Sequence, residues 1–432
     1  MKKKVYFCNM KRIALLLIAV VLGGTAIGQK SGTGSKDMPD TVTIVLSTPP
    51  HYKVQRELRL LSESADYAWW MMPWGTPQLK GGWHVGVDAT TFLRDAAFSL
   101  PYTRGYTATG FFVTPYVGHK IGSDAEVSFG VHLAGVAGSE GIRQWKPMVR
   151  LEYNPHDNVR WVMGSLYSAM SHRLFEPMFD RERFVYAHQE EGAQLLACLP
   201  MGTTILETDT WLHWEELLEP WQMTQERFTL GSSNEWTFLQ LEGRPSITFA
   251  VPFSFLGTHR GGQFSALDTC IESLFNENVG LRANVVLGLR SALAVDVPFF
   301  FYQDISPTKY QKYDKGWGLW PQVSYDVDLG MGHAALGEDN RPRWHGSWHL
   351  LAQVGYWYGN QFVAPRGSYH FQSVSWHKKD FVAPEREMVT AKVGLENWNT
   401  SQFSLGMDAE FYYDLMEKGL DFAFGIYMRY RL

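Results

Sequence analysis

Apolar residues occupy every second position of residues 419–432, which read GLDFAFGIYMRYRL. Strand side chains alternate between two faces, so this pattern predicts one strand with an apolar face and a more polar face. The stretch is longer than an ordinary strand of about 5–6 residues. It is long enough for the roughly 9–11 tilted residues that cross a bilayer. The pattern therefore predicts a membrane-spanning strand.

The same alternation recurs from residue 82 to residue 432 and predicts an all-β, transmembrane, antiparallel up-and-down barrel of about 16 strands (14–18). Only helices and closed barrels satisfy the backbone in lipid, and a barrel of this size leaves an aqueous lumen. A secreted sandwich stays open as an alternative, because its strands also alternate. The clearest alternating runs are residues 125–134, 145–153, 159–164, 247–255, 323–330, 348–358, 389–396 and 403–413.

The first residues read as a secretory signal peptide. Basic residues precede a short apolar run, residues 13–22, and Ala26 and Gly28 stand at −3 and −1 to a cut before Gln29. We therefore expect a signal peptide over residues 1–28, a short N-terminal extension over residues 29–81, and a barrel over residues 82–432. The extension is predicted to lie in the periplasm or inside the lumen.

Composition supports an envelope protein and excludes a nucleic-acid partner. Aromatic residues make up 15% of the chain, with 17 Trp and 20 Tyr, as expected for the aromatic girdles of a barrel. Such richness also fits an extracellular sugar-binding β protein. Removing residues 1–28 removes five of the 39 basic residues and no acidic one, which leaves 34 basic residues against 44 acidic ones. We expect Cys198 and Cys270 to be packed thiols, although pairing stays open.

Three further stretches resemble Bacteroidota outer-membrane β-barrels of the porin-like kind. They are the cut before Gln29, the GYTATG run at residues 105–110, and HRLFEPMFDRER at residues 172–183. The resemblance implies a Gram-negative outer-membrane location and passage of small solutes, without a cofactor or metal. We expect outer-membrane lipid, small solutes and the barrel-assembly machinery as partners, while a homo-oligomer stays open. Gly425, Met428 and Tyr430 resemble the C-terminal signal that this machinery reads.

Charged residues are densest between residues 172 and 191, where apolar residues interrupt them. A solvated loop has no need of those apolar residues, so two interpretations stay open. One is a salt-bridged structural loop, and the other is an inward loop that narrows the pore and pairs with Arg150, Glu152 and Arg160. The candidate constriction residues are His172, Arg173, Glu176, Asp180, Arg181, Glu182 and Arg183.

A second cluster, residues 209–221, combines carboxylates with Trp and reads either as a sugar site or as an interfacial strand end. A barrel lipase needs Ser, His and an amide or carboxylate together on the outer wall, and no local signature links such residues here. The sequence therefore predicts a passive channel and no enzyme. The alternatives are a carbohydrate-binding protein and a barrel enzyme that acts on lipids.

Overall fold

A computed structural model of the chain describes residues 82–431, which belong to one compact unit, Val45–Leu432. The short segments it leaves out are residues 140–141, 157, 168–171, 183–188, 218–224, 242–244, 262–270, 288–290, 330–332, 337–341, 346, 376 and 399–402. The predicted signal peptide and N-terminal extension lie outside the described residues.

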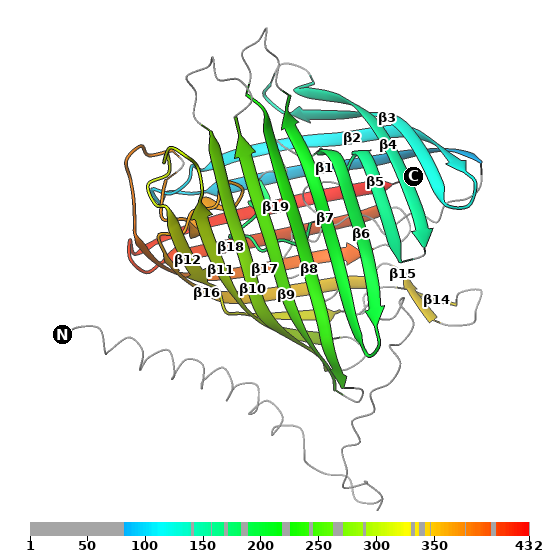
Figure 1. Ribbon diagram of the computed structural model, residues 1–432. Helices are drawn as coiled ribbons and strands as arrows, with labels where there is room; N and C mark the ends of the chain where they lie inside the picture. The colour runs from blue at the N-terminus through cyan, green and yellow to red at the C-terminus, as the bar shows by residue number, and fades with distance from the viewer. Residues whose placement is uncertain are drawn as a thin grey trace, which may run out of the picture. The chain divides into compact units, whose positions relative to one another are not determined.

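Antiparallel strands form a closed barrel (Figure 1), because β19 pairs back to β1. The wall is a 17-stranded sheet in which β12 and β13 share one position, since both pair with β11 and β16. The barrel therefore has 16 strand positions, which confirms the predicted fold class. The strands are β1 Trp83–Ala97, β2 Tyr106–Ile121, β3 Ala125–Val136, β4 Gln144–His156, β5 Val159–Ser165, β6 Glu191–Met201, β7 Thr204–Glu216, β8 Arg227–Leu241, β9 Ser246–Arg260, β10 Glu272–Val286, β11 Ser291–Asp304, β12 Lys315–Leu319, β13 Gln322–Asp328, β16 Ser347–Asn360, β17 Glu385–Trp398, β18 Phe403–Asp414 and β19 Gly419–Arg431.

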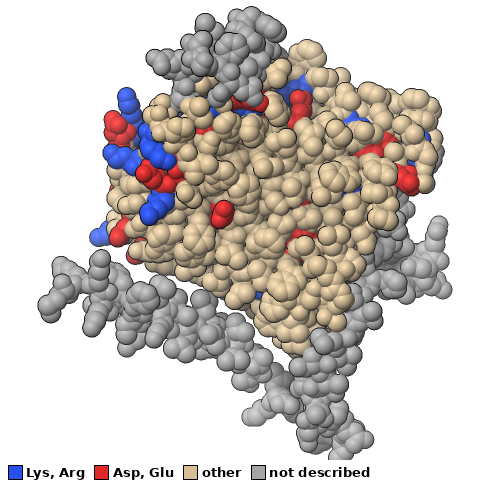
Figure 2. Space-filling view, viewed as in Figure 1, with Lys and Arg blue, Asp and Glu red and all other residues tan. Residues whose placement is uncertain are grey.

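The outer wall is apolar because alternate residues of each strand point away from the lumen. In β19, Phe422, Phe424 and Ile426 are exposed on this wall, whereas Asp421 and Ala423 between them are buried. Figure 2 shows charged side chains sparse over the middle of this face and gathered toward its edges. Within the described residues, no helix is long and apolar enough to cross a bilayer.

The two ends of the barrel differ in the length of their connections. Long segments join β5 to β6 and β16 to β17 at one end, which we call the loop end. Short turns such as residues 122–124 and 202–203 lie at the other end, together with Trp83 and Arg431. The exception is the connection from β13 to β16, which carries the hairpin of β14 His333–Leu336 and β15 Pro342–His345. Outer-membrane barrels keep short turns in the periplasm, so the loop end faces the cell surface.

Two connections from the loop end fold into the barrel. We call residues 166–167 and 172–182 the first inner segment and residues 361–375 and 377–384, with the short 3-10 helix η5 Tyr369–Phe371, the second inner segment. They touch each other where Asp180 N–H donates to the Arg366 carbonyl (2.6 Å). Gly367 packs on the Pro177 carbonyl so closely that no side chain fits there.

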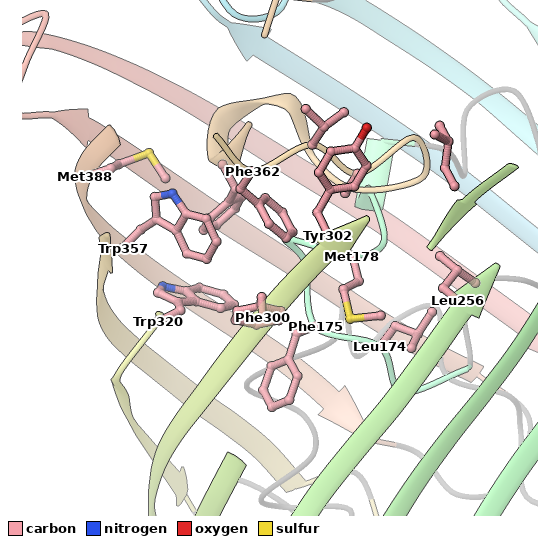
Figure 3. Close-up of a cluster of buried hydrophobic side chains, with 14 of the residues drawn as sticks. Leu174, Phe175, Met178, Leu256, Phe300, Tyr302, Trp320, Trp357, Phe362 and Met388 are labelled. Atoms are coloured by element: carbon pink, nitrogen blue, oxygen red, sulfur yellow. The ribbon is translucent and has the colours of Figure 1, made fainter. Parts of the chain in front are cut away.

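Apolar side chains from both inner segments and from the wall form one core inside the barrel (Figure 3). Phe175 and Met178 come from the first segment and Phe362 from the second, and all three are buried. They pack against inward rings of the wall such as Trp320 and Trp357. The described part of the lumen is therefore filled at this level by packed side chains.

Candidate active site

A serine and a histidine meet on the outer wall near the loop end. His259 on β9 and Ser273 on β10 stand directly opposite each other, and Ser273 Oγ lies 2.8 Å from His259 Nδ1. Leu256 and Leu274 on the same strands are buried in the lumen. His259 and Ser273 lie an odd number of residues from these leucines, so they face outward. Both side chains are half-buried. A nucleophile and a base thus share the lipid-facing side of the wall.

The hydrogen bond made by Nε2 of His259 determines which of the two ring nitrogens is protonated. Nε2 lies 2.7 Å from the carbonyl oxygen of Gly261, which only accepts hydrogen bonds. Nε2 must therefore donate, and Nδ1 is left to accept from the Ser273 hydroxyl. Gly261 has a φ of 89°, a conformation that favours glycine, and its N–H donates to the Glu226 carbonyl (2.9 Å). The arrangement is a nucleophile, a base and an orienting acceptor.

The backbone of Ser273 is held from the neighbouring strand. Its N–H donates to Ser306 Oγ (2.8 Å), and its carbonyl accepts from Ile305 N–H (3.0 Å). Ser306 N–H in turn donates to Oδ1 of the buried Asp304 (2.8 Å). Ser273 is therefore held by hydrogen bonds from the chain that follows β11 as well as by His259 on β9.

Aromatic rings continue the wall beside His259. Phe228 on β8 lies 5.0 Å from the His259 ring, and Trp214 on β7 stacks on Phe228 at 5.5 Å. Below them, Phe255 and Phe275 form an outward pair 5.3 Å apart. The dyad thus lies where the aromatic girdle meets the apolar band.

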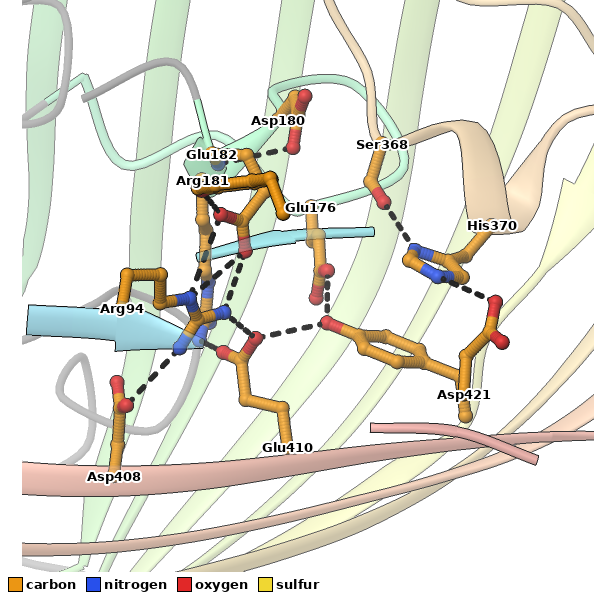
Figure 4. A network of polar contacts seen from close by, with 12 residues as sticks. Arg94, Glu176, Asp180, Arg181, Glu182, Ser368, His370, Asp408, Glu410 and Asp421 are labelled. Carbon is orange, nitrogen blue, oxygen red and sulfur yellow. Dashed lines mark hydrogen bonds and ion pairs between the residues drawn. The ribbon is translucent and has the colours of Figure 1, made fainter. Parts of the chain in front are cut away.

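A second serine and histidine lie inside the barrel (Figure 4). Ser368 Oγ is 3.2 Å from His370 Nδ1, and His370 Nε2 is 3.3 Å from Asp421 Oδ2. All three residues are buried, and the His370 ring stacks on Tyr412 at 4.2 Å. A lipid in the bilayer has no route to Ser368 through this packing. We therefore assign this group to holding the second inner segment in place.

The structure brings the predicted constriction residues together inside the barrel, except Arg183, which lies outside the described residues. The fully buried His172 is clamped between Asp209 and Glu190, 2.9 Å from each carboxylate, and its ring stacks on Trp211 at 3.6 Å. Burial alone lowers the pKa of His172, but the two carboxylates outweigh it and raise the pKa to about 9. Arg173 lies 2.8 Å from Glu207.

The other charged residues described in the first inner segment, Glu176, Asp180, Arg181 and Glu182, belong to one ionic network inside the barrel (Figure 4). Glu182 accepts from Arg94 (2.5 Å) and from the Tyr106 hydroxyl. Arg181 lies 3.1 Å from Glu410. Asp180 lies at the edge of this network and accepts from the Glu182 N–H at 3.0 Å. Each of these contacts ties the segment to the wall or fixes its own turn.

Glu176 is the innermost member of the network. It contacts Lys392 and accepts from the Tyr412 hydroxyl at 2.6 Å. Lys392 on β17 also lies 3.4 Å from Glu410 on β18. One ammonium group therefore pairs with a carboxylate of the inner segment and a carboxylate of the wall. A buried charge is tolerated when it is paired, and here the pairing spans segment and wall.

Among the described residues, two wall residues predicted to pair with this charged stretch make other contacts. Arg150 donates to the carbonyls of Ser165 and Leu166, and Glu152 accepts from the hydroxyl of Tyr167, all of which precede the charged stretch. The charged residues instead reach β1, β7, β17 and β18, because the segment crosses the lumen.

The second predicted cluster splits between the two faces of the wall. Asp209, Trp211 and His213 face the lumen, whereas Trp214 is exposed outside. Glu219 and Trp221 lie outside the described residues. Of the candidate assembly signal, Met428 and Tyr430 are exposed on the outer wall and Gly425 faces inward. Cys198 is buried on β6, and Cys270 lies outside the described residues.

Several solved structures are similar to this chain, among them an outer-membrane protein of Vibrio cholerae. A loop-deletion mutant of OmpT from Vibrio cholerae has a TM-score of 0.45 at 9% identity, covering 81% of this chain and 100% of its own. OprB from Pseudomonas putida has a TM-score of 0.45 at 8% identity, covering 81% and 94%. OccAB4 from Acinetobacter baumannii has a TM-score of 0.39 at 12% identity, covering 83% and 100%. No curated protein matches the sequence.

One family model matches residues 75–334 and 345–432, and it is described as lipid A 3'-O-deacylase-type. A deacylase is an enzyme that cleaves an acyl ester. The prediction of no enzyme is therefore wrong. The sequence did not point to this candidate site because Ser273 and His259 stand on separate strands, and only the β9–β10 register joins them.

Proposed function

The chain belongs to the lipid A 3'-O-deacylase-type family, and on that premise we propose that it is an outer-membrane esterase. Its substrate is an acylated glycolipid of the lipid A kind. Ser273 is the nucleophile, His259 is the general base, and the Gly261 carbonyl orients the base. The observation that carries this assignment is the 2.8 Å contact between Ser273 Oγ and His259 Nδ1 on the lipid-facing wall.

The position of the dyad suits an ester embedded in a membrane. Acyl esters lie where the polar headgroup of a lipid meets its hydrocarbon chains. The dyad stands at the same depth, between the aromatic girdle and the apolar band that contains Phe255 and Phe275. A substrate reaches it by moving sideways in the outer leaflet, without entering the lumen. Its acyl chain then rests on the apolar band.

The chemistry follows from the hydrogen bonds of His259. Ser273 Oγ attacks the ester carbonyl carbon while its proton passes to His259 Nδ1. The tetrahedral intermediate breaks its bond to the sugar oxygen, which leaves with the proton from Nδ1. Water then attacks the acyl-serine, again losing its proton to Nδ1. The bond between the acyl carbon and Ser273 Oγ breaks, Oγ takes the proton back from Nδ1, and the fatty acid is released. Throughout, the Gly261 carbonyl accepts from Nε2–H and favours the imidazolium that forms.

The other functions that the sequence leaves open have less support. Packed apolar side chains and an ionic network fill the described lumen near the loop end, which is unfavourable for a passive channel. An outer-membrane location contradicts the alternative of a secreted carbohydrate-binding protein. The barrel enzyme that acts on lipids is the alternative that the family and the outer-wall dyad both support.

Released fatty acid provides the test. The purified barrel is incubated with lipid A in mixed micelles, and the products are identified by mass spectrometry. We expect fatty acid and a lipid lacking one acyl chain from the wild type, and neither from Ser273→Ala. Ser368→Ala, which removes the buried hydroxyl in the lumen, is the matched control and should keep activity. Loss of activity in Ser368→Ala with full activity in Ser273→Ala overturns the assignment.

A further inference from the structure

A row of rings leads from the outer wall to the base. Trp214, Phe228 and His259 lie on three neighbouring strands, with successive centroids 5.5 and 5.0 Å apart and interplanar angles of 28° and 33°. Trp214 is the outermost member and is 40% exposed. The three rings form a continuous surface that extends from the aromatic girdle to the pair of His259 and Ser273. We call it the aromatic shelf.

A bulge in β7 next to Trp214 orients the Trp214 side chain. The pairing of β7 with β8 shifts register between Trp214 and Glu216, which leaves Glu215 as an extra residue. Glu215 turns inward, where it contacts Arg366 of the second inner segment and accepts from the Thr229 hydroxyl. A half-buried ion pair on the inner face thus holds the bulge, next to which Trp214 points outward. Bulges of this kind re-aim side chains next to active sites.

Polar groups stand at the rim beyond the shelf. Glu216 and Arg227 lie 3.5 Å apart, and each side chain is 41% exposed. They pair with each other at the loop end of β7 and β8, and Arg227 directly precedes the outward Phe228, so this ion pair belongs to the inner face of the wall. The shelf itself is a flat apolar surface, which matches the face of a pyranose ring that offers C–H groups.

We propose that the aromatic shelf binds the sugar ring that carries the scissile ester, with Trp214 as its main platform. This inference rests on the proposed function and adds a subsite to it. A ring lying on Trp214 and Phe228 places its ester substituent beside His259 and Ser273. The shelf therefore selects acyl esters of sugars over acyl esters of simple alcohols.

A selectivity measurement tests the subsite. Two substrates are compared: lipid A in mixed micelles and the p-nitrophenyl ester of a fatty acid, which has no sugar. We expect Trp214→Ala to lower the ratio of kcat/KM for lipid A to that for the simple ester about tenfold, mainly through KM. Trp214→Phe, which keeps a flat ring, should recover most of the ratio.

Trp236 is the matched control. It is also 40% exposed on the outer wall and has a neighbouring ring, Phe238, at 5.8 Å, but it lies near the opposite end of β8. We expect Trp236→Ala to keep the selectivity ratio within about twofold, because an ordinary girdle residue contributes only membrane anchoring. An equal fall of the ratio in both variants, or no fall in Trp214→Ala, overturns the subsite.

A binding measurement separates this inference from the proposed function. Saturation-transfer NMR with the deacylated lipid A disaccharide, on Ser273→Ala, reports sugar contacts without catalysis. We expect signals on the sugar protons that disappear in Ser273→Ala/Trp214→Ala and persist in Ser273→Ala/Trp236→Ala. Signals that persist without Trp214 overturn the subsite. A wild type that hydrolyses neither substrate overturns the proposed function, while the NMR result still decides the subsite.

Discussion

His259 Nδ1 lies 2.8 Å from Ser273 Oγ across the β9–β10 pair, although 14 positions of chain separate the two residues. The register of two strands, fixed along their whole length, sets this distance. A slip of one residue moves a side chain to the opposite face of a strand. The pair therefore depends on the same hydrogen-bond ladder that builds the wall.

Removing the base tests its role separately from the nucleophile. We expect His259→Gln to lower kcat by about 10²–10⁴-fold, the usual contribution of a general base. The melting temperature should change little, because the residue is half-buried on the outer wall. Steady-state hydrolysis and a thermal melt check this. A His259→Gln enzyme with wild-type kcat contradicts the mechanism.

Gly261 tests the orienting carbonyl. Its φ of 89° is strained for any residue with a Cβ, so we expect Gly261→Ala to destabilise the turn by about 1–3 kcal/mol. The shifted carbonyl then releases Nε2 of His259, and kcat should fall by more than KM rises. A matched glycine is Gly202, whose φ is 66° in the distant β6–β7 turn. Gly202→Ala should cost similar stability and leave kcat unchanged.

His172 makes the anchoring of the first inner segment depend on pH. The pKa of His172 in the folded protein, about 9, lies above the ordinary value near 6.5. The protonated His172 therefore stabilises the folded protein fully below about pH 6.5, and this stabilisation is lost as the pH rises through 9. Its contribution to the free energy of unfolding is roughly 3 kcal/mol. We expect hydrogen exchange in residues 172–182 to accelerate between pH 7 and pH 10 beyond its intrinsic rise. His172→Gln should show no such transition.

Lys392 holds two buried carboxylates, those of Glu176 and Glu410. We expect Lys392→Met to destabilise the barrel by about 3–5 kcal/mol, because it leaves the buried carboxylate of Glu176 without its cationic partner. Lys392→Met/Glu176→Gln should recover part of that loss. Chemical denaturation of the refolded variants measures both effects. Equal stability of the single and double variants shows that the pair is not coupled.

We propose that the first inner segment blocks the pore. Deleting residues 174–182 should raise the conductance in planar bilayers, since it removes Phe175 and Met178 from the core of the lumen. Replacing Arg173, Arg181 and Arg183 together with Ala should shift ion preference toward cations. Unchanged conductance and ion preference in both variants mean that the segment has only a structural role.

Met428 and Tyr430 test the closing strand. Both are about two-fifths exposed on the outer wall. Replacing both with Asp puts charge on the lipid-facing side at a cost of up to a few kcal/mol each. We expect the double variant to be lost from the outer membrane in fractionation. Normal insertion contradicts the proposed assembly signal.

The sequence by itself determined the wall of this protein. Alternation with period two is a local property, so the strands around residues 125–134, 389–396 and 419–432 and the apolar outer face were predictable from neighbouring residues alone. The apolar residues within residues 172–191 indicated that this loop packs against other parts of the chain, but the sequence left open whether it does so inside the barrel, where Leu174, Phe175 and Met178 are buried.

Only the tertiary structure decided which distant residues meet. Strand pairing placed Ser273 beside His259, barrel closure brought Glu182 to Arg94, and the fold of the second inner segment brought Arg366 to Glu215. No short motif encodes these contacts, because each depends on register, turn length and the number of strands around the barrel. The sequence therefore predicted a membrane barrel and a channel, whereas the outer-wall dyad that supports an esterase depends on the pairing of β9 with β10.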